Sequence, residues 1–309
     1  MMMRTALVIP SLGAASLDSC LQATQRLQPA PDEVLLVLSG ERSDTAPTRD
    51  IPVLRSDRRL GFAGAVNAGI NAVWRRADAV GLLNDDALPD TTWFGRLTAA
   101  LESEPSLAAV QGTVTDATGE VVDGRGILIN RWGLAEQVDR GAEALPEPNL
   151  PAPRVAVSAT AALFRTDALR AAALTGGAVL DPTFDSYHED VDLGLRLYRL
   201  GWLSEWIPNA RCRHLGSSTG AGLSWRHPWW LLANPWRVVA GNLRPWATLR
   251  LLPRTAWGEL RALPRLSRQN PRTPLASLAV TLALPALIVS GWRRATPGAR
   301  LSSLPPEAS

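Results

Sequence analysis

The stretch Val80-Gly81-Leu82-Leu83-Asn84-Asp85-Asp86 joins a short apolar run to three polar residues, two of them acidic. An apolar run of this length, ended by polar residues, is typical of a buried strand in a parallel sheet. Ligands bind such sheets beyond the carboxyl ends of the strands, where Asn84, Asp85 and Asp86 would lie. Neighbouring carboxylates repel each other and are costly to bury without a cation. The stretch therefore predicts both a sheet and a functional site at its edge. The alternative is a polar turn in which an aspartate caps the next helix.

Apolar runs and helical patterns alternate through the first third of the chain. Besides the strand at 80–83, we expect strands and helices at the following ranges: strands Thr5–Ile9, Val34–Leu38 and Ile51–Leu54, and helices Leu17–Leu27, Ala63–Arg76 and Thr92–Ser103. This alternation predicts an α/β fold with a mainly parallel sheet flanked by helices. Further along, the expected elements are strands Val110–Val114 and Val155–Ala161, a loop at Glu143–Pro153 and a helix at Val191–Leu200.

A second acidic cluster, His188-Glu189-Asp190-Val191-Asp192, opens the last of these helices. Acidic side chains at a helix start are stabilised by the helix dipole and could simply cap it. Two adjacent acids followed by Asp192 exceed what capping requires, so we favour a functional role for the cluster. His214 is either an ordinary surface or core histidine or a neutral metal ligand.

The segment Arg59–Ile70 is rich in glycine and leads into a helix. Gly61 and Gly64 allow a ligand to approach the backbone closely, and Asn67 offers an amide for hydrogen bonds. The pattern is neither GxGxxG nor a P-loop, so it does not predict a dinucleotide or ATP site. The alternative is a tight turn between a strand and a helix.

The 309 residues are enough for one large domain with an appendage, and all 32 basic residues are arginine. Cys20 and Cys212 are too few for a disulfide framework, which fits a reducing compartment. Met1–Ala15 has some features of a signal peptide. Because Pro10 interrupts its short apolar run, a first strand is the better interpretation.

Charge is distributed unevenly along the chain. Up to residue 210 there are 18 arginines against 27 acidic residues, whereas from Arg211 onward there are 14 arginines against two glutamates. Nine of the 12 tryptophans lie at or beyond Trp202. Arginine and tryptophan interleaved with leucine indicate an anionic membrane surface as partner, and the aliphatic content argues against nucleic acid.

We therefore divide the chain into a domain that carries the predicted site, residues 1–220, and a helical, membrane-associating C-terminal extension, residues 221–309. Five prolines between 228 and 264 are expected to cut the extension into short helices. Leu275–Trp292 carries no charge and is only just long enough for a membrane span, and arginines flank both of its ends. We expect an in-plane or re-entrant hairpin bent near Pro285, at the cytoplasmic face of the inner (plasma) membrane, with a true span as the alternative. No internal repeat is expected, and disorder is expected only at 295–309.

In this order, the motifs resemble the family 2 glycosyltransferases of the GT-A fold, especially bacterial rhamnosyltransferase-like members. The resemblance runs from about residue 4 to 220. It rests on Leu60–Ile70, Asn84-Asp85-Asp86, Ala162-Leu163-Phe164-Arg165, and the segment from Glu189 through Arg196 to Gly201-Trp202 and His214.

The resemblance implies a role for each matching residue. Asp86 and His214 would bind a divalent metal, Mg²⁺ or Mn²⁺, with Asp85 in support. Asp190 would be the general base, and Glu189 would shape its environment. The expected substrate-binding residues are Pro10, Ser39, Gly61, Gly64, Asn67, Asn84, Asp85 and Arg165.

Two departures from the family pattern concern the substrates. Ser39 stands where the family usually has an aspartate that contacts the base, so we expect that contact to be made differently. Ser158-Ala159 stands where a glycine is common, which affects the loop on the acceptor side.

The implied reaction transfers a sugar, rhamnose by nearest resemblance, from a nucleotide diphosphate sugar to a hydroxyl with inversion. The basic extension indicates a glycan or polyprenyl-linked acceptor in cell-surface polysaccharide synthesis. A nucleotidyltransferase is a weaker alternative, because it usually needs a glycine- and lysine-rich loop. A scaffold subunit of a polysaccharide assembly system is the other alternative, but it would be expected to lose Asp86, Asp190 and His214.

Overall fold

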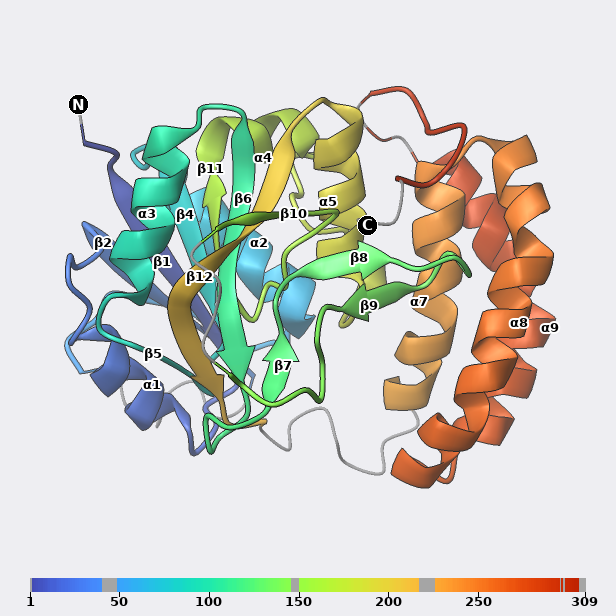
Figure 1. Ribbon diagram of the computed structural model, residues 1–309, viewed down its shortest axis with the longest axis horizontal. Helices are drawn as coiled ribbons and strands as arrows, with labels where there is room; N and C mark the ends of the chain where they lie inside the picture. Colours follow the sequence, from blue (N-terminus) through green and yellow to red (C-terminus); the bar gives the residue numbers. More distant parts are fainter. Residues whose placement is uncertain are drawn as a thin grey trace.

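The computed structural model of the chain describes residues 2–40, 49–145, 150–216, 226–294, 296 and 298–305. Glu41–Asp44, beside the expected base contact, and parts of the expected loop at 143–153 and of the tail at 295–309 lie outside these residues. Figure 1 shows a sheet covered by helices, with three long C-terminal helices along one side of it. This arrangement confirms the predicted α/β fold with a helical C-terminal region.

The main sheet has the strand order β10-β12-β6-β11-β4-β1-β2-β3, with β5 beside β12 and β7 beside β6. The parallel strands of one half are β1 (Thr5–Ser11), β2 (Glu33–Ser39), β3 (Val53–Ser56) and β4 (Ala79–Leu83). The other half contains β5 (Ala87–Pro89), β6 (Leu107–Thr115), β7 (Val122–Gly124), β10 (Ala152–Arg154), β11 (Ala161–Arg165) and β12 (Leu203–His214). Strand β11 runs antiparallel to both β4 and β6. The strands β8 (Ile127–Ile129) and β9 (Ala135–Gln137) form a separate hairpin.

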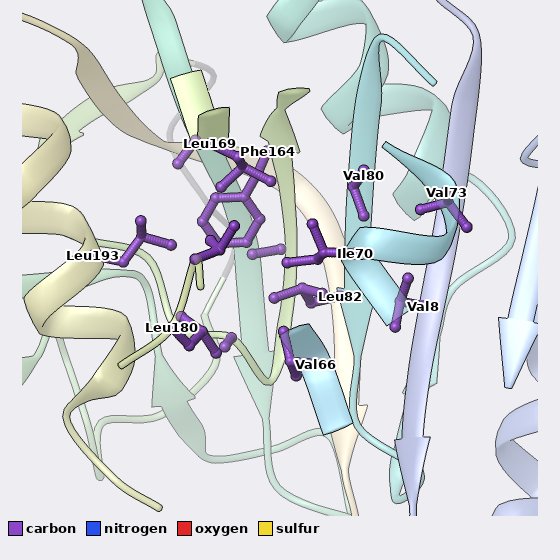
Figure 2. Packing of buried hydrophobic residues seen from close by; sticks show 14 of the residues in the cluster. Val8, Val66, Ile70, Val73, Val80, Leu82, Phe164, Leu169, Leu180 and Leu193 are labelled. Atoms are coloured by element: carbon purple, nitrogen blue, oxygen red, sulfur yellow. The ribbon is translucent and has the colours of Figure 1, made fainter. Parts of the chain in front are cut away.

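Helices cover both faces of the sheet because its central strands are apolar on both sides. They are α1 (Leu17–Thr24), α2 (Gly61–Val73), α3 (Trp93–Ser103), α4 (Thr166–Ala172) and α5 (Glu189–Arg199), with a short 3₁₀ turn at Pro182–Phe184. On one face Val66 and Ile70 of α2 meet Phe164 of β11 and Leu193 of α5 in a single core (Figure 2). On the other face α1 and α3 bury a second core.

The expected strand at Val155–Ala161 is wrong. Residues Val155 and Ala156 are buried, but their backbone amides donate to the Ile127 carbonyl, and the chain then turns before β11 begins at Ala161. The apolar run therefore reflects burial of a connecting segment, which periodicity alone does not distinguish from a strand.

The expectation of short C-terminal helices is also wrong. From residue 226 onward the described part of the chain forms α7 (Arg226–Asn242), α8 (Pro245–Gln269) and α9 (Thr273–Arg293). Helix α8 continues through Pro253 and Pro264, and α9 continues through Pro285, so α9 is not a hairpin. Each of these three prolines is exposed. The residues four positions earlier, whose carbonyls lose their helical partners, are Leu249, Leu260 and Thr281, and these are exposed as well. Part of the expected tail is ordered as well, since Leu301 exchanges backbone hydrogen bonds with Asn242 and Arg244.

A buried ionic cluster joins the C-terminal helices to α5. Asp192 is fully buried and accepts hydrogen bonds from Arg196 Nε (2.9 Å), from Asn242 Nδ2 (2.7 Å) and from Arg294, which follows α9. Arg294 also donates to Asp181 at 2.7 Å. Burial alone would raise the pKa of Asp192, but Arg294 and Arg196 outweigh it and hold that pKa below its usual range. Asp192 is therefore a structural anchor, although its sequence position groups it with Glu189 and Asp190, the acids that are expected to act in catalysis.

Replacing Arg294 with alanine leaves two buried carboxylates with one cationic partner fewer. We expect Arg294→Ala to lower the free energy of unfolding by about 3–5 kcal/mol, the cost of stranding a buried charge. Urea denaturation measures this change. The neighbouring Arg293 is exposed, and Arg293→Ala should cost less than about 0.5 kcal/mol. Equal losses in the two variants would show that the cluster does not hold the helices in place.

Candidate active site

The predicted site residues of the parallel strands gather at one edge of the sheet. Pro10 pairs with Val37, and Ser39 pairs with Ser56, so both lie at the carboxyl ends of their strands. Asn84, Asp85 and Asp86 follow β4 at the same edge. Ser39 is buried, and its Oγ has no hydrogen-bond partner among the described residues. The edge thus brings together the segments that the sequence assigns to the donor.

Asp86 and His214, separated by most of the chain, lie next to each other. His214 ends β12 and pairs with Ala87, which places its Nε2 3.3 Å from Oδ1 of Asp86. Its Nδ1 lies 2.9 Å from Oδ2 of Asp123 on β7, and Arg140 contacts the other Asp123 oxygen at 3.2 Å. Burial would lower the pKa of His214, but the hydrogen bonds and charges of Asp123 and Asp86 outweigh it and raise the pKa to about 9.

Asp86 and His214 are suitable ligands for one divalent cation. Because Asp123 engages Nδ1, the nitrogen that faces Asp86 is Nε2, and a carboxylate behind a histidine is the usual outer partner of a metal-binding imidazole. Within the described ranges, no group of three or more His, Cys, Asp or Glu side chains is arranged to hold a metal ion. The pair therefore forms an open set of protein ligands, which suits Mg²⁺ or Mn²⁺ when phosphate oxygens fill other positions.

Asp85 is held by the end of β1. Its carboxylate accepts a hydrogen bond from the Ser11 hydroxyl. Burial raises the pKa of Asp85 to about 6, the Ser11 hydrogen bond opposes the rise, and the Asp86 charge adds to it. Asp85 thus positions the turn that carries Asp86. The side-chain oxygen of Asn84 is buried with no partner among the described residues.

The two acidic clusters meet through the turn between residues 158 and 160. The backbone amide of Ala159 donates to Oδ2 of Asp190 at 3.3 Å. The next carbonyl, that of Thr160, accepts from the backbone amide of Asn84 at 2.8 Å. Two consecutive residues thereby connect the start of α5 with the end of β4, so the predicted base and the predicted metal ligands belong to one site.

Glu189 and Asp190 have different surroundings. Glu189 is 5% exposed and its Oε2 has no hydrogen-bond partner among the described residues, so burial, with the Asp190 charge, raises its pKa well above the ordinary value. Burial also raises the pKa of Asp190, but the backbone amides of Val191 and Ala159 oppose that shift. The pKa of both carboxyl groups is therefore raised, that of Glu189 more strongly. Asp190 is the group that ionises first.

The loop before α5 is strained. Asp185, Tyr187 and His188 have φ angles of 60°, 69° and 71°, a region that residues other than glycine rarely adopt. Asn234 of α7 fixes this loop, since its Nδ2 lies 2.8 Å from the Tyr187 carbonyl, 2.9 Å from that of Ser186 and 3.2 Å from that of Phe184. Strain of this kind persists only where the surroundings impose it, and here it precedes the candidate base.

The glycine-rich segment has a different role from the one expected. Gly61 has a φ of 68°, and a Cβ there would lie 2.2 Å from an Asp185 side-chain oxygen, so this glycine accommodates the strained loop. Gly64 lies in α2, where a Cβ would meet only Leu60 of its own helix turn. Asn67 is 9% exposed, and its side chain bonds the backbone of Val179 and Leu180 at 2.7–2.9 Å. The Asn67 amide therefore holds the backbone at Val179 and Leu180, which corrects the prediction that Asn67 faces the nucleotide.

The substrate-binding role predicted for Arg165 is wrong. Because β11 runs antiparallel to β4, Arg165 pairs with Ala79 at the beginning of β4, the edge opposite Asn84. Its guanidinium donates to the carbonyls of Leu101 (2.5 Å) and Leu107 (2.8 Å). Arg165 therefore secures the connection between α3 and β6.

Sequence reasoning missed Asp123, Ser11 and Asn234. Asp123 lies in a short strand, Val122–Gly124, with no motif around it. Ser11 ends the first strand and resembles any polar residue at that position. Asn234 lies in α7, a separate helix that comes much later in the sequence than the loop that it fixes. No spacing rule connects these residues with Asp86 or Asp190, so only the fold identifies them.

Loss of the Asp123 carboxylate should change the titration of His214. We expect Asp123→Asn to lower the pKa of His214 from about 9 toward its ordinary value of 6.5, because a neutral amide cannot stabilise the imidazolium as a carboxylate does. Imidazole signals followed by NMR over pH measure the shift. Asp139→Asn, which removes an exposed partner of Arg125, is the matched control and should leave the value unchanged. A pKa unaffected by Asp123→Asn would contradict the contact.

Glu189 should make stability fall with rising pH. Its raised pKa means that the folded protein keeps a proton that the unfolded chain loses above about 4.5, so the unfolding free energy falls by about 1.4 kcal/mol per pH unit until the folded pKa is reached. Glu189→Gln removes this dependence. Chemical denaturation at several pH values should show the variant gaining stability relative to the unmodified protein as pH rises. Parallel pH profiles would show that the Glu189 carboxyl is not desolvated.

Comparisons with known proteins identify the family and the fold of the chain. The family model described as "Glycosyltransferase like family 2" matches residues 3–231. GalNAc-T7, solved with UDP, GalNAc and Mn²⁺, is 14% identical with a TM-score of 0.59, over 79% of this chain and 49% of that one, so this chain spans about half its length. The mannosyltransferase PcManGT from Pyrobaculum calidifontis, solved with GDP-Man and Mn²⁺, is 15% identical with a TM-score of 0.51, over 94% of this chain and 86% of that one. No curated protein matches the chain significantly. At such identities the two structures share the fold, and the family match shows that this chain belongs to the family 2 glycosyltransferases.

Proposed function

We propose that this chain transfers a sugar from a nucleotide diphosphate sugar to an acceptor hydroxyl, with inversion at the anomeric carbon. The observation that carries this proposal is the placement of Asp86 beside His214, with Asp190 joined to the same edge by Ala159 and Thr160. One side of the site thus offers ligands for a cation and its diphosphate, and the other side offers a carboxylate base. A scaffold subunit would have no use for this combination, so the catalytic role is favoured.

Asp86 and His214 would hold a divalent cation, Mg²⁺ or Mn²⁺, which when bound neutralises the departing diphosphate. The two structural neighbours were solved with Mn²⁺. Asp123 keeps the His214 ring in the orientation that presents Nε2, and Ser11 keeps the Asp85 turn in place. These contacts are present before substrate binds, so the ligands need little rearrangement.

Asp190 would accept the proton of the acceptor hydroxyl as that oxygen attacks the anomeric carbon from the face opposite the diphosphate. A base works best with a pKa near the working pH, and burial moves the pKa of Asp190 upward from the low value of an exposed aspartate. Protonated Glu189 leaves the negative charge on Asp190. The strained loop at 185–188 and Asn234 set the start of α5 and hence the direction of this carboxylate.

The donor would be a nucleotide diphosphate sugar whose base is recognised near β2. The neighbours were solved with UDP in one case and GDP-Man in the other. Ser39 is buried and offers a hydroxyl in place of the family's usual carboxylate, which supports a base contact of a different kind. Rhamnose remains the proposed sugar from the family resemblance.

The acceptor would be a glycan or a polyprenyl-linked sugar, used in cell-surface polysaccharide synthesis at the cytoplasmic face of the inner membrane. Helix α9 is long and apolar enough to cross a membrane, and 28% of its most apolar window is buried. One face of α9 packs on α7, with Gly291 against Ala240 and Gly241. That packing supports peripheral attachment, with α9 lying in the membrane plane.

Calorimetric titration tests the donor site. UDP, dTDP and GDP are added separately, each with and without Mn²⁺, to the unmodified protein, Asp86→Ala and Asp190→Asn. We expect metal-dependent binding of one nucleotide, lost in Asp86→Ala and kept in Asp190→Asn. Turnover of the matching nucleotide sugar should fall by about 10²–10⁴ in Asp190→Asn, the usual contribution of a general base.

Asp167→Asn is the matched control, because Asp167 is also an acid in the first turn of a helix, α4, but is exposed and lies outside the loop at 185–188. It should retain far more activity than Asp190→Asn. If none of the three nucleotides binds, the scaffold alternative becomes the favoured function. If Asp190→Asn loses nucleotide binding, and its turnover falls only in proportion to that loss, Asp190 is not the base.

A further inference from the structure

Helix α8 contains a repeat. The segment Trp246–Ala256 reads WATLRLLPRTA, and the segment of equal length that follows it, Trp257–Ser267, reads WGELRALPRLS. The two segments are identical at six positions, in the pattern Trp-x-x-Leu-Arg-x-Leu-Pro-Arg. This corrects the expectation that the chain has no internal repeat.

The spacing of this repeat places equivalent side chains on the same face of the helix. One repeat makes slightly more than three full turns, so repeated positions differ by only about 20° in direction and lie about 16 Å apart. The observed exposures agree: Trp246 and Trp257 are 47% and 51% exposed, and Leu249 and Leu260 are 54% and 56% exposed. The two segments therefore present the same surface twice.

The exposed face of α8 consists of two adjoining rows. At 100° per residue the apolar row covers about 80° of the helix circumference, and the arginines occupy the next 60° or so. The apolar row is made of Trp246, Leu249, Pro253, Trp257, Leu260 and Pro264, all exposed. The arginine row is made of Arg250, Arg254, Arg261, Arg265 and Arg268, also exposed.

Packing within the protein does not explain the repetition. The opposite face of α8 contacts the rest of the chain: Thr255 donates to the Trp132 carbonyl at 3.0 Å, and Gly258 lies against the Trp132 side chain. At these inward positions the two segments differ, with Thr248 replaced by Glu259 and Thr255 by Leu266. Five of the six repeated positions are exposed, so the repetition belongs to the outward face.

We propose that this face of α8 binds an anionic lipid bilayer, with the helix lying in the membrane plane. The tryptophans and leucines would enter the headgroup boundary, and the arginine row would contact lipid phosphates. This inference deepens the membrane attachment within the proposed function, because it names the element, its orientation and the headgroup charge. In Figure 1, α8 and α9 lie on the side of α7 away from the sheet, where a flat surface can reach them.

Charge argues against a second copy of the chain that meets this one through the same face of α8. Within the described part of the C-terminal region, from 226 onward, Glu259 is the single acidic residue. It accepts a hydrogen bond from Trp236 Nε1 at 2.9 Å and so faces inward. The α8 face thus has arginines and no carboxylate, and two such faces would repel each other. An anionic headgroup layer matches both rows.

Flotation of the full chain with vesicles tests the proposal, using phosphatidylcholine alone and phosphatidylcholine mixed with phosphatidylglycerol. We expect binding to the anionic vesicles. Arg254→Gln and Arg265→Gln occupy equivalent positions and should each weaken it about fivefold, the usual effect of one basic residue at such a surface, and together about 25-fold. Trp246→Ala with Trp257→Ala should weaken it by roughly tenfold. The matched control, Arg26→Gln with Arg75→Gln, removes two exposed charges from the sheet domain and should change binding less than about twofold.

Several outcomes would overturn the proposal. The first is equal binding to neutral and anionic vesicles. The second is a loss of binding in the control pair equal to that in the arginine pair. The third is unchanged binding in both the arginine and the tryptophan double variants. A dimer seen by sedimentation and lost in the tryptophan variant would assign the face to a second copy. If the protein binds an oligonucleotide but not vesicles, and Arg254→Gln with Arg265→Gln abolishes that binding, the face would be assigned to nucleic acid. Vesicle flotation uses no donor and nucleotide titration uses no lipid, so failure of one leaves the other result standing.

Discussion

The buried carboxylate of Asp192 connects the two halves of this protein. It lies one turn into α5 and accepts hydrogen bonds from Arg196 of the same helix, Asn242 of α7 and Arg294 after α9. A charge buried this completely is tolerated only with such partners, so α5 cannot take its place without the C-terminal helices. The proposed catalytic region and the proposed lipid-binding region therefore share one ionic cluster. Deleting the residues after 225 would remove Asn242 and Arg294 from Asp192 and leave it with Arg196. Substitutions on the exposed face of α8 are therefore the cleaner way to separate attachment from catalysis.

The same constraint extends into the active site. The residue two positions before Asp192 is Asp190, the candidate base, and the strained loop at 185–188 leads directly into it. Asn234 of α7 binds three carbonyls of that loop, and Gly61 of α2 leaves room for Asp185. The direction of the Asp190 carboxylate is thus set by contacts from helices on both sides of it. Strain in the loop is sustained by these contacts, which is the usual arrangement where a catalytic group must be held in one orientation.

The sequence was most informative where a local pattern determines the structure. The strand at 80–83 with its trailing acids, the acids that open α5, and the order of the motifs all follow from periodicity and position, and the family match confirms the resemblance they carry. Pairing across the fold was not available from such patterns. Arg165 lies at the wrong edge because β11 is antiparallel, and Asp123 reaches His214 only because β7 folds back on β6. The prolines of α8 were misjudged because a proline on an exposed face costs a hydrogen bond without ending the helix.

Helix α7 relates the lipid-binding proposal to the catalytic one. One of its faces fixes the loop before Asp190 through Asn234, and its other contacts bury α9 and reach α8 through Trp236 and Glu259. A bilayer bound at α8 would therefore hold the loop, the base and the sheet edge in a fixed relation to the membrane surface. A polyprenyl-linked acceptor has a hydroxyl that can move only within that surface. With the site fixed relative to the membrane, the base and the acceptor hydroxyl would meet by diffusion in two dimensions. The repeat in α8 fits this need, because two equivalent contacts about 16 Å apart fix the direction of a helix on a surface, whereas one contact would leave it free to turn.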